Sequence, residues 1–300
     1  NNSWFTKDNI LFSLESWAKA LTSKNITTWL ENQEFNDSKS TVAIIMAGNI
    51  PLVGFHDFLT VLIAGHAVLV KQSSNDKNLL PFLAKYLEYV EPSIKGSIKF
   101  TEKKLEKFDA VIATGSNNTA RYFEHYFKGK PSIIRKNRNS VAVITGNETE
   151  EELANLGDVF QYFGLGCRSV SKLYVPENYN FDAFFNGLYS KKEIINNAKY
   201  ANNYDYNKAV YLMSEFDLLE NGFLMIKEDE SYASPIATIF YEYYSDVDQL
   251  KKKLKADADK VQCIVSNGFM DTEIAFGQTQ HPQLWDYADG LNTLDFLANI

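Results

Sequence analysis

Cysteine and histidine are scarce in this sequence, and the spacings that hold metals or disulfides are missing. The 300 residues include two cysteines, Cys167 and Cys263, which lie far apart and outside any CxxC spacing. A disulfide framework and a zinc site built on cysteine pairs are therefore excluded, and a reducing compartment suits both thiols. The four histidines form no HExxH or HxH pair, so we expect no metal site.

Long apolar runs and an excess of basic residues are also lacking. No stretch of about 18 apolar residues occurs, and the opening NNSWFTKDNI has neither the basic flank nor the apolar core of a signal peptide. We therefore expect a cytoplasmic protein without a membrane span. The formal net charge of −8 argues against a general basic surface, so we expect no nucleic-acid partner.

The sequence does contain the material for a large core and an alternation of strands and helices. Hydrophobic residues make up 45% of the chain and charged residues 23%, and the length is typical of two domains. Apolar residues at helical spacing predict helices in segments 11–22 and 26–33. From Thr41 onward the pattern predicts strands at 41–48, 67–71, 97–100 and 109–114, alternating with helices at 51–64, 78–89 and 117–127.

The strand pattern restarts after the basic stretch RKNRN. Strands are predicted at 140–145, 172–175, 235–244 and 261–267, and helices at 150–163, 181–199 and 204–213. Short strands separated by helices of about a dozen residues predict right-handed βαβ units and parallel sheets. We therefore predict an α/β protein with two doubly wound domains, residues 1–139 and residues 140–300, and we infer the boundary from this restart.

One cysteine lies where a nucleophile could be presented. The stretch FGLGCRSVSKLYVP places Cys167 on a glycine-containing turn between a predicted helix and a predicted strand. Such a turn can expose a side chain to a cleft and direct nearby amide N–H groups, which suits an attacking thiolate. Cysteine is also often buried, so a small packing residue is the alternative. Cys263, inside VQCIVSN, is interpreted as a residue of a strand core.

The residues around Cys167 resemble the active-site signature of the aldehyde dehydrogenase superfamily. The matching features are Gly164 before the cysteine, and Ser171, Lys172 and the strand LYV after it. The resemblance implies that Cys167 is the catalytic nucleophile and forms a thioester with the substrate.

MAGNIP, which contains Asn49, resembles the superfamily's strand that ends in Asn and Pro before a helix. The resemblance implies that the Asn49 amide and the Cys167 backbone N–H form an oxyanion hole. Asn is also a favoured helix N-cap, and Pro51 a favoured early helical residue, so Asn49 can cap a helix as well.

AGHAVLVKQSS, which contains Lys71 and Ser74, resembles the superfamily segment GNTVVVKPSE, whose lysine binds the adenosine ribose hydroxyls. This implies that Lys71 binds the cofactor, whereas a solvated strand end is the alternative. NAD-preferring members often place a Glu three residues after this lysine, where its charge would repel a 2′-phosphate. This chain has Ser74 there, so the expected cofactor is NADPH, with NADH possible.

ATGSNNTARYF resembles the superfamily's FTGST element and brings a strand to Thr114, Gly115 and Ser116 at the start of a helix. The amides and dipole of a helix start attract phosphate, so these three residues are expected to bind the cofactor. Taken alone, Ser116 is equally consistent with a helix cap.

The general base of ordinary aldehyde dehydrogenases is missing. Their ELGG segment supplies a Glu that activates water, and the aligned segment here is RKNR, from Arg135 to Arg138. Without that carboxylate, a Cys167 thioester is expected to exchange with a thiol such as coenzyme A. This departure and the segment 44–76 resemble the acyl-CoA reductase family that includes the fatty-acid reductase of bacterial bioluminescence, and the resemblance covers most of 10–300.

A second departure concerns the superfamily's Glu that holds the nicotinamide ribose near an FGP triplet. Its position corresponds to Ser231 in ESYASPIAT, and the adjacent Glu230 is expected to serve instead. The resemblance further implies an aldehyde-dehydrogenase-like fold and a homo-oligomer. It assigns the dinucleotide-binding domain with its N-terminal helices to 1–139 and the catalytic cysteine domain to 140–300, with the active site in the cleft between them.

Two functions follow from the resemblance. The first is NADPH-dependent reduction of a long-chain acyl-CoA to the aldehyde through an acyl-thioester on Cys167. The alternative is a non-redox acyl-binding or acyl-transfer protein on the same fold, which the missing Glu equivalents and the short chain motivate.

Two further features have competing interpretations. Basic residues cluster between Lys128 and Arg138, where they either attract the phosphates of a cofactor or of CoA or form a solvated face. His56 follows Asn49 and is either a proton donor near the site or a partly buried histidine with its hydrogen bonds satisfied.

Overall fold

The computed structural model describes residues 2–35 and 38–300 and divides the chain into two units. The first unit contains Asn1–Asn137 together with Pro282–Ile300, and the second contains Arg138–His281. The sequence-based division after residue 139 lies two residues from the division after Asn137. The assignment of residues 282–300 to the second domain is wrong, because this segment packs into the core of the first unit.

The first unit is built on a five-stranded sheet in the order β3-β2-β1-β4-β5, with every neighbouring pair parallel. Its strands are β1 (Thr41–Ile45), β2 (Ala67–Lys71), β3 (Ile98–Thr101), β4 (Ala110–Thr114) and β5 (Ser132–Arg135). Its α-helices are α1 (Lys7–Ala20), α2 (Ser23–Leu30), α3 (Phe55–Ile63), α4 (Leu79–Val90), α5 (Asn117–Tyr126) and α10 (Thr293–Ala298). Two 3-10 turns, η1 (Pro92–Ile94) and η4 (Ala288–Gly290), complete this unit.

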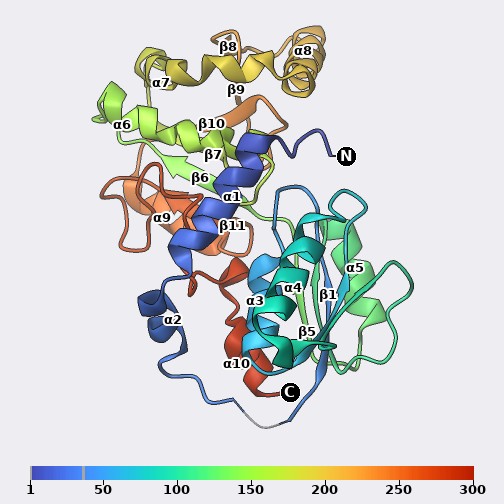
Figure 1. Cartoon of the computed structure of the whole chain (residues 1–300). Helices are drawn as coiled ribbons and strands as arrows, with labels where there is room; N and C mark the ends of the chain where they lie inside the picture. The colour runs from blue at the N-terminus through green and yellow to red at the C-terminus, as the bar shows by residue number, and fades with distance from the viewer. Residues whose placement is uncertain (1, 36–37) are drawn as a thin grey trace. The chain divides into compact units, whose positions relative to one another are not determined.

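Side chains on the two faces of this sheet enter different cores, because successive residues of a strand point to opposite faces. Val42 and Ile44 of β1 pack with α3 and α4 on one face. Ala43 packs on the other face, where Phe127 at the end of α5 joins the same core. Helices therefore cover both faces, as a parallel sheet requires (Figure 1).

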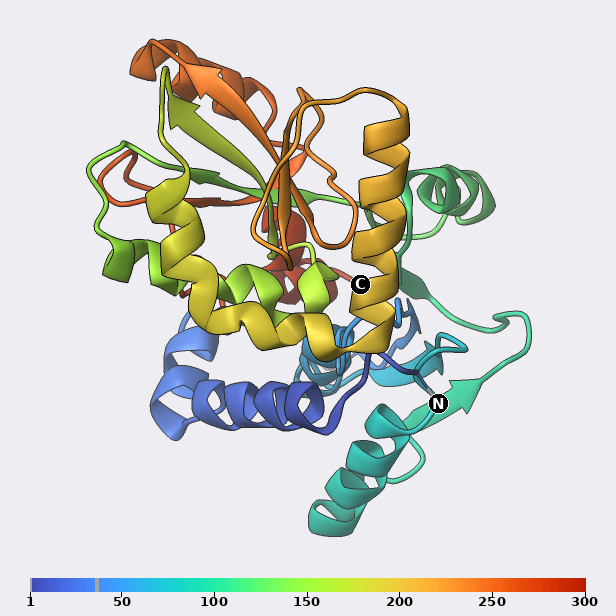
Figure 2. The same cartoon turned by 90° about the horizontal axis from the view of Figure 1, so that it is seen from above.

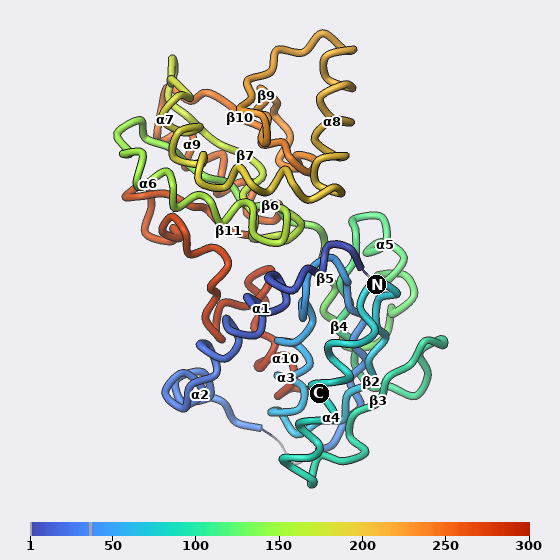
Figure 3. Tube along the Cα trace, turned by 45° about the horizontal axis from the view of Figure 1, so that its top comes forward, coloured from blue at the N-terminus to red at the C-terminus, as the bar shows by residue number. Residues whose placement is uncertain are grey.

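The C-terminal segment is tied into the first unit by buried polar contacts. The Arg135 guanidinium pairs with the Asp57 carboxylate of α3 and donates to the Thr293 hydroxyl of α10 at 3.0 Å. The side chains of Arg135 and Asp57 are 7% and 6% exposed. His66 also hydrogen bonds the Leu297 carbonyl at 3.0 Å. Helix α10 consequently lies beside α3 (Figure 3).

The second unit contains a six-stranded sheet in the order β11-β6-β7-β10-β9-β8, parallel except for the β8–β9 pair. Its strands are β6 (Asn139–Val143), β7 (Val170–Pro176), β8 (Leu219–Glu220), β9 (Met225–Glu228), β10 (Thr238–Tyr244) and β11 (Val261–Val265). Its helices are α6 (Glu150–Ala154), η2 (Asn155–Gly164), α7 (Asp182–Leu188), η3 (Tyr189–Asn196), α8 (Ala198–Met213) and α9 (Val247–Ala256).

Helices cover both faces of this second sheet as well. Leu153 of α6 and Phe184 of α7 pack on one face against β7 residues such as Leu173. Leu250 and Leu254 of α9 pack on the other face. Helix α8 runs beside the β8–β9 hairpin (Figure 2), and its Tyr200 hydroxyl donates to the Phe223 carbonyl at 2.9 Å. The prediction of an α/β protein with two doubly wound parallel sheets is confirmed.

Several predicted helices are shorter than the pattern suggests. The helix predicted at 150–163 is α-helical only to Ala154 and continues as the 3-10 segment η2. Tyr162 and Phe163 adopt left-handed φ angles of 54° and 58°, which end the helix just before the cysteine turn. The helix predicted at 51–64 begins at Phe55, after four residues of turn. Among the described residues, no helix has the length and apolarity needed to cross a membrane.

Candidate active site

The carboxyl ends of three neighbouring strands gather most of the predicted residues of the first unit. Strand β1 lies between β2 and β4, with Ile45 opposite both Lys71 and Ala113. The chain continues from β1 toward β2 on one side and reaches β4 on the other, so β1 and β4 flank a topological switch point. In open α/β sheets, ligands bind outside the carboxyl ends of the strands at such a point.

Asn49 and Lys71 follow adjacent strands at this edge. Asn49 lies in the turn between β1 and α3 and is half-buried. Lys71, also half-buried, ends β2, and its carbonyl accepts from the Met46 amide at 3.1 Å. A Cβ added at Gly48 would lie 2.5 Å from the Ser73 hydroxyl, so the loops after β1 and β2 approach too closely for any larger residue. Ser74, in the next turn, is exposed.

The loop from β4 to α5 holds the third predicted element. Gly115 donates its amide to the Arg135 carbonyl at 3.2 Å, and a Cβ there would lie 3.0 Å from Thr119. Ser116 is the N-cap of α5 and accepts from the Thr119 amide at 3.2 Å. The capping interpretation of Ser116 is therefore confirmed. Thr114 ends β4 and is half-buried. Residues at the start of α5 are exposed, so the positive end of its dipole faces solvent.

In the second unit, the cysteine turn lies between η2 and the first residue of β7. Cys167 is half-buried, whereas Cys263 in β11 is 4% exposed. The interpretation of Cys263 as a strand core residue is confirmed. Cys167 is thus the more accessible residue of the two. Gly164, with φ 76°, extends the left-handed segment that redirects the chain into this turn.

Contacts with three residues that are distant in the sequence hold the cysteine turn. The Ser140 hydroxyl donates to the Cys167 carbonyl at 2.9 Å. The Arg168 guanidinium donates to the Thr279 carbonyl, and the Gln280 amide donates to the Ser169 hydroxyl at 3.3 Å. These contacts fix the backbone on both sides of the thiol. Ser140, Thr279 and Gln280 could not be identified from the sequence, since no local pattern marks such long-range partners.

A buried carboxyl group supports one of these anchors. Asp158 of η2 accepts from the Thr279 amide at 3.1 Å and from the Thr279 hydroxyl. Burial raises the pKa of Asp158, although the hydrogen bonds from Thr279 oppose the rise. Asp158 thus links η2 to Thr279, the residue whose carbonyl accepts from Arg168.

Glu230 lies in the connection between β9 and β10 and is exposed. Its neighbour Asp229 is anchored, since the Asp229 carboxylate pairs with Lys227 at 2.6 Å and accepts from the Ser231 amide at 2.9 Å. Burial acts to raise the pKa of Asp229, but the hydrogen bonds and the Lys227 charge lower it to about 2. The loop around Glu230 therefore has a defined backbone.

Several basic residues of the stretch before the second unit form ion pairs or hydrogen bonds within the fold. Arg135 is the buried partner of Asp57, and Lys136 pairs with Glu124 at 2.8 Å. Lys130 donates to a backbone carbonyl of the first unit. These contacts support neither a cluster of free charges at this place nor a wholly solvated face.

His56 is a packed residue with a hydrogen-bond partner. Its Nε2 lies 2.8 Å from the Leu284 carbonyl, and its ring packs against Trp17, Trp29 and Tyr287. Burial lowers the pKa of His56, although the Asp57 charge opposes the shift. The interpretation of a satisfied, largely buried histidine agrees with these contacts.

The predicted residues therefore fall into two sets, one in each unit. The first unit brings together the set that follows β1, β2 and β4: Asn49, Lys71, Ser74, Thr114, Gly115 and Ser116. The second unit carries Cys167 before β7 and Glu230 after β9. No group of three or more His, Cys, Asp or Glu side chains suited to a metal ion occurs in the described part of the chain.

The description of the matching family model is acyl-CoA reductase (LuxC), and the match covers residues 26–233. This range is more than two thirds of the chain and includes every predicted site residue in both units. The chain belongs to the acyl-CoA reductase (LuxC) family. The family suspected from the cysteine motif and the missing ELGG carboxylate is thereby confirmed.

Solved structures similar to this LuxC-family chain are aldehyde dehydrogenases. Aldehyde dehydrogenase 21 from Physcomitrella patens, in complex with succinate, superposes with a TM-score of 0.63 at 14% identity, over 86% of this chain and 64% of that one. The indole-3-acetaldehyde dehydrogenase AldA of P. syringae, in complex with NAD⁺ and IAA, gives 0.64 at 13% identity, over 85% and 63%. A Mycobacterium tuberculosis aldehyde dehydrogenase complexed with NAD⁺ gives 0.58 at 13% identity, over 88% and 66%.

These similarities establish the aldehyde-dehydrogenase-like fold of the LuxC-family chain. The chain spans 64% and 63% of the length of the first two of these enzymes. No curated protein sequence matches the chain.

Proposed function

We propose that this LuxC-family chain is a nicotinamide-dependent acyl-CoA reductase that converts an acyl-CoA, long-chain in the first instance, to the aldehyde through a thioester on Cys167. The observation that carries the proposal is the family match across residues 26–233. That range includes the half-buried Cys167 on its anchored turn. A cytoplasmic location and a homo-oligomeric state are part of the same proposal.

In the first half-reaction, the Cys167 thiolate attacks the carbonyl carbon of the acyl-CoA thioester. A carbon–sulfur bond to Cys167 forms, and the bond to the CoA sulfur breaks. The CoA thiolate leaves with the electron pair and takes a proton from solvent. The contacts of Ser140, Arg168 and Ser169 support this role, because a nucleophile on a fixed turn avoids part of the entropic cost of orientation.

Charge develops on the carbonyl oxygen during attack and needs hydrogen-bond donors. We assign this role to the Cys167 backbone N–H and to the Asn49 side-chain amide. The thioester is not hydrolysed quickly, because the segment aligned with ELGG has Arg135 in place of the glutamate base. The Arg135 guanidinium itself is paired with the Asp57 carboxylate. After reduction, the tetrahedral oxyanion collapses, the bond to Cys167 breaks, the aldehyde leaves and the thiolate is restored.

The residues at the β1–β4 switch point fit a dinucleotide. Gly115 leaves room for Thr119 where a Cβ would crowd it at the entry to α5, whose exposed N-terminus suits a phosphate, and Lys71 lies at the end of a strand next to β1. Glu230 is assigned to the nicotinamide ribose. The cofactor, when bound, supplies the hydride that reduces the thioester carbon. The NAD⁺ complexes of the similar P. syringae and M. tuberculosis enzymes support a nicotinamide cofactor.

The proposal is tested by mixing the purified chain with NADPH or NADH and with short-chain or long-chain acyl-CoAs. We expect loss of absorbance of the reduced cofactor together with release of one CoA thiol for each cofactor oxidised. A second measurement, cofactor fluorescence on titration with protein, separates the alternatives. Absence of cofactor binding up to millimolar concentration, with acyl transfer retained, would instead support the non-redox acyl-transfer protein.

We expect Asn49→Ala to lower the turnover of acyl-CoA reduction by about 10²–10³-fold, because loss of one oxyanion donor costs about 3–4 kcal/mol of transition-state stabilisation. The KM for acyl-CoA should change much less, since the oxyanion exists only after attack. The matched control is Asn75→Ala in the exposed turn after β2, with no expected effect. A loss confined to the KM would contradict this role for Asn49.

We expect Ser74→Glu to raise the KM for NADPH about tenfold while leaving the KM for NADH nearly unchanged. The introduced carboxylate would repel a 2′-phosphate, and NADH has none. Ser74→Ala is the control for loss of the hydroxyl alone. Steady-state kinetics with both cofactors measures the shift, and equal changes for NADPH and NADH would show that Ser74 does not face the 2′ position.

A further inference from the structure

The segment that contains Glu230 is an unusually short connection between neighbouring parallel strands. Strands β9 and β10 pair in parallel, with Met225 opposite Thr238 and Glu228 opposite Tyr241. Parallel neighbours are usually joined by a dozen or more residues with a helix. Here residues 229–237 make the whole connection. We call residues 229–235 the Glu230 loop. Because no helix or strand forms within it, its path must be held by contacts with other segments.

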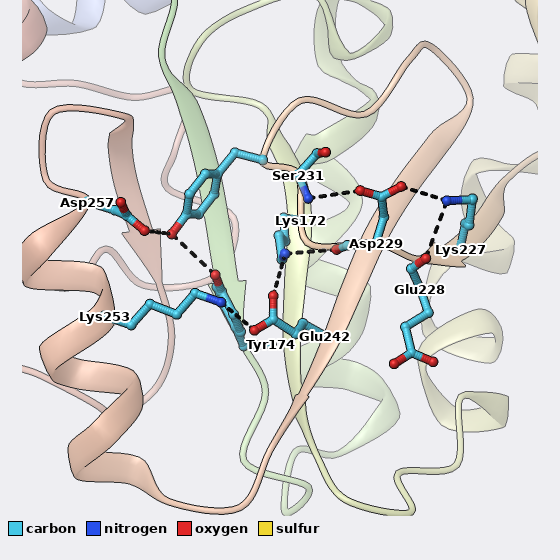
Figure 4. Close-up of polar contacts among 10 residues, drawn as sticks. Lys172, Tyr174, Lys227, Glu228, Asp229, Ser231, Glu242, Lys253 and Asp257 are labelled. Carbon is cyan, nitrogen blue, oxygen red and sulfur yellow. Dashed lines mark hydrogen bonds and ion pairs between the residues drawn. The ribbon is translucent and has the colours of Figure 1, made fainter.

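Two consecutive side chains of β7 provide such contacts. The Lys172 ammonium donates to the Asp229 carbonyl at 2.8 Å, and the Ser171 hydroxyl donates to the Tyr232 carbonyl at 2.6 Å. Both acceptors are backbone atoms, so these bonds fix the course of the loop on either side of Glu230. Figure 4 shows Lys172 between the Asp229 backbone and Glu242.

A local irregularity of β7 explains how neighbouring residues reach one loop. In a regular strand, consecutive side chains point to opposite faces. The register between β6 and β7 shifts here, since Ser140 pairs with Val170 and Val141 pairs with Lys172. Ser171 is therefore the extra residue of a β-bulge, a feature that re-aims side chains and is frequent beside active sites.

Burial of the Lys172 ammonium group carries a large desolvation cost. Its side chain is 0% exposed, and an ammonium group without water needs close compensation. Glu242 supplies it at 2.8 Å, and the rings of Tyr174 and Tyr232 lie 5.2 and 5.5 Å from the ammonium nitrogen. Burial lowers the pKa of Lys172, although Glu242 opposes the shift. An apolar side chain could fill such a site at least as stably. The hydrogen bond from Lys172 to the Asp229 carbonyl therefore offers a functional reason for the lysine.

We propose that Ser171 and Lys172 are positioning residues, which hold the Glu230 loop through the Tyr232 and Asp229 carbonyls and thereby set the place of the Glu230 carboxylate. The proposal rests on the assignment of Glu230 to the nicotinamide ribose in the proposed function. The bulge that begins β7 links the catalytic turn and the cofactor loop within the second unit, since Cys167 precedes these two residues on the same short segment.

The chain offers a matched control. Lys253 of α9 also pairs with Glu242, but the structure places no contact between Lys253 and the backbone of the Glu230 loop among the described hydrogen bonds. If Lys172 serves only to neutralise Glu242, then Lys172→Met and Lys253→Met should behave alike. If Lys172 positions the loop, only Lys172→Met and Ser171→Ala should affect it.

The test compares Ser171→Ala, Lys172→Met and Lys253→Met with the unchanged chain by two readouts. The Kd for NADPH and for NADH, from cofactor fluorescence, should rise about threefold in Ser171→Ala, about tenfold in Lys172→Met and less than twofold in Lys253→Met. Amide hydrogen exchange without cofactor should become faster in residues 229–235 in the first two variants only. In Lys253→Met, the rate of CoA release without cofactor should also stay within about twofold of the unchanged chain.

Unchanged cofactor affinity and unchanged exchange in Ser171→Ala and Lys172→Met would overturn the inference, as would equal effects in Lys253→Met. Ser171→Ala keeps the buried charge pair intact, so it decides the matter if Lys172→Met fails to fold. The failure of the proposed function gives a different result. In that case the unchanged chain itself binds neither cofactor, while the exchange readout still reports whether these residues hold the loop.

Discussion

Cys167→Ser is expected to lower acyl-CoA reduction by about 10⁴-fold or more, the largest effect of any substitution considered, because the nucleophile of both half-reactions is removed. A serine hydroxyl at the same place is a far weaker nucleophile at neutral pH, and no general base is assigned to activate it. Cofactor binding should be retained, since the cofactor is assigned to other residues. Stopped-flow absorbance of the reduced cofactor and a fluorescence titration measure the two properties separately.

Cys263→Ala is the matched control for this experiment. Cys263 is 4% exposed in β11 and packs in the core of the second unit, so its substitution should cost some stability and little activity. Retained turnover in Cys167→Ser, or an equal loss in Cys263→Ala, would contradict the assignment of Cys167 as the nucleophile.

The second large effect is expected on stability. Arg135→Met should lower the free energy of unfolding of the first unit by about 3–5 kcal/mol, because it leaves the Asp57 carboxylate buried without its partner. The substitution also removes the hydrogen bond to Thr293 that ties α10 to the sheet. Denaturant unfolding followed by circular dichroism measures the change.

The neighbouring residue supplies the control for Arg135. Lys136 pairs with Glu124, but these side chains are 51% and 48% exposed, and exposed ion pairs contribute about 0–1 kcal/mol. Lys136→Met should therefore change stability by less than about 1 kcal/mol. Equal losses in the two variants would show that the buried pair does not hold the first unit together.

Most strands of the two parallel sheets could be predicted from the sequence, because most of them contain a short run of β-branched residues and are followed by an apolar helical pattern. Strand β5 was not predicted, since SIIR is short and merges into a basic stretch, and only its pairing with β4 makes it a strand. Helix α9 was also missed, because its apolar positions are few among several lysines. Strands β8 and β9 were not predicted either, because LE and MIKE are short and β8 pairs only with β9 in a hairpin.

The return of the C-terminal segment to the first unit could not be predicted from local patterns. Arg135 and Thr293 are separated by 158 positions in the sequence, and no periodicity links them. The same holds at the cysteine turn, where Ser140 and Thr279 lie 27 and 111 positions from their partners. Sequence motifs identified the candidate site residues, whereas the contacts that hold these residues in place depend on the complete fold.

The proposed mechanism depends on acyl transfer through a thioester on Cys167. The most direct test is to incubate the chain with a saturated long-chain acyl-CoA, such as palmitoyl-CoA, without cofactor and to locate the acyl group by mass spectrometry of the digested protein. We expect one acyl group on the peptide that contains Cys167, with an equal amount of free CoA, and loss of that group as aldehyde when reduced cofactor is added. An acyl group on Cys263, or an enzyme that reduces acyl-CoA while Cys167 is never acylated, would contradict it.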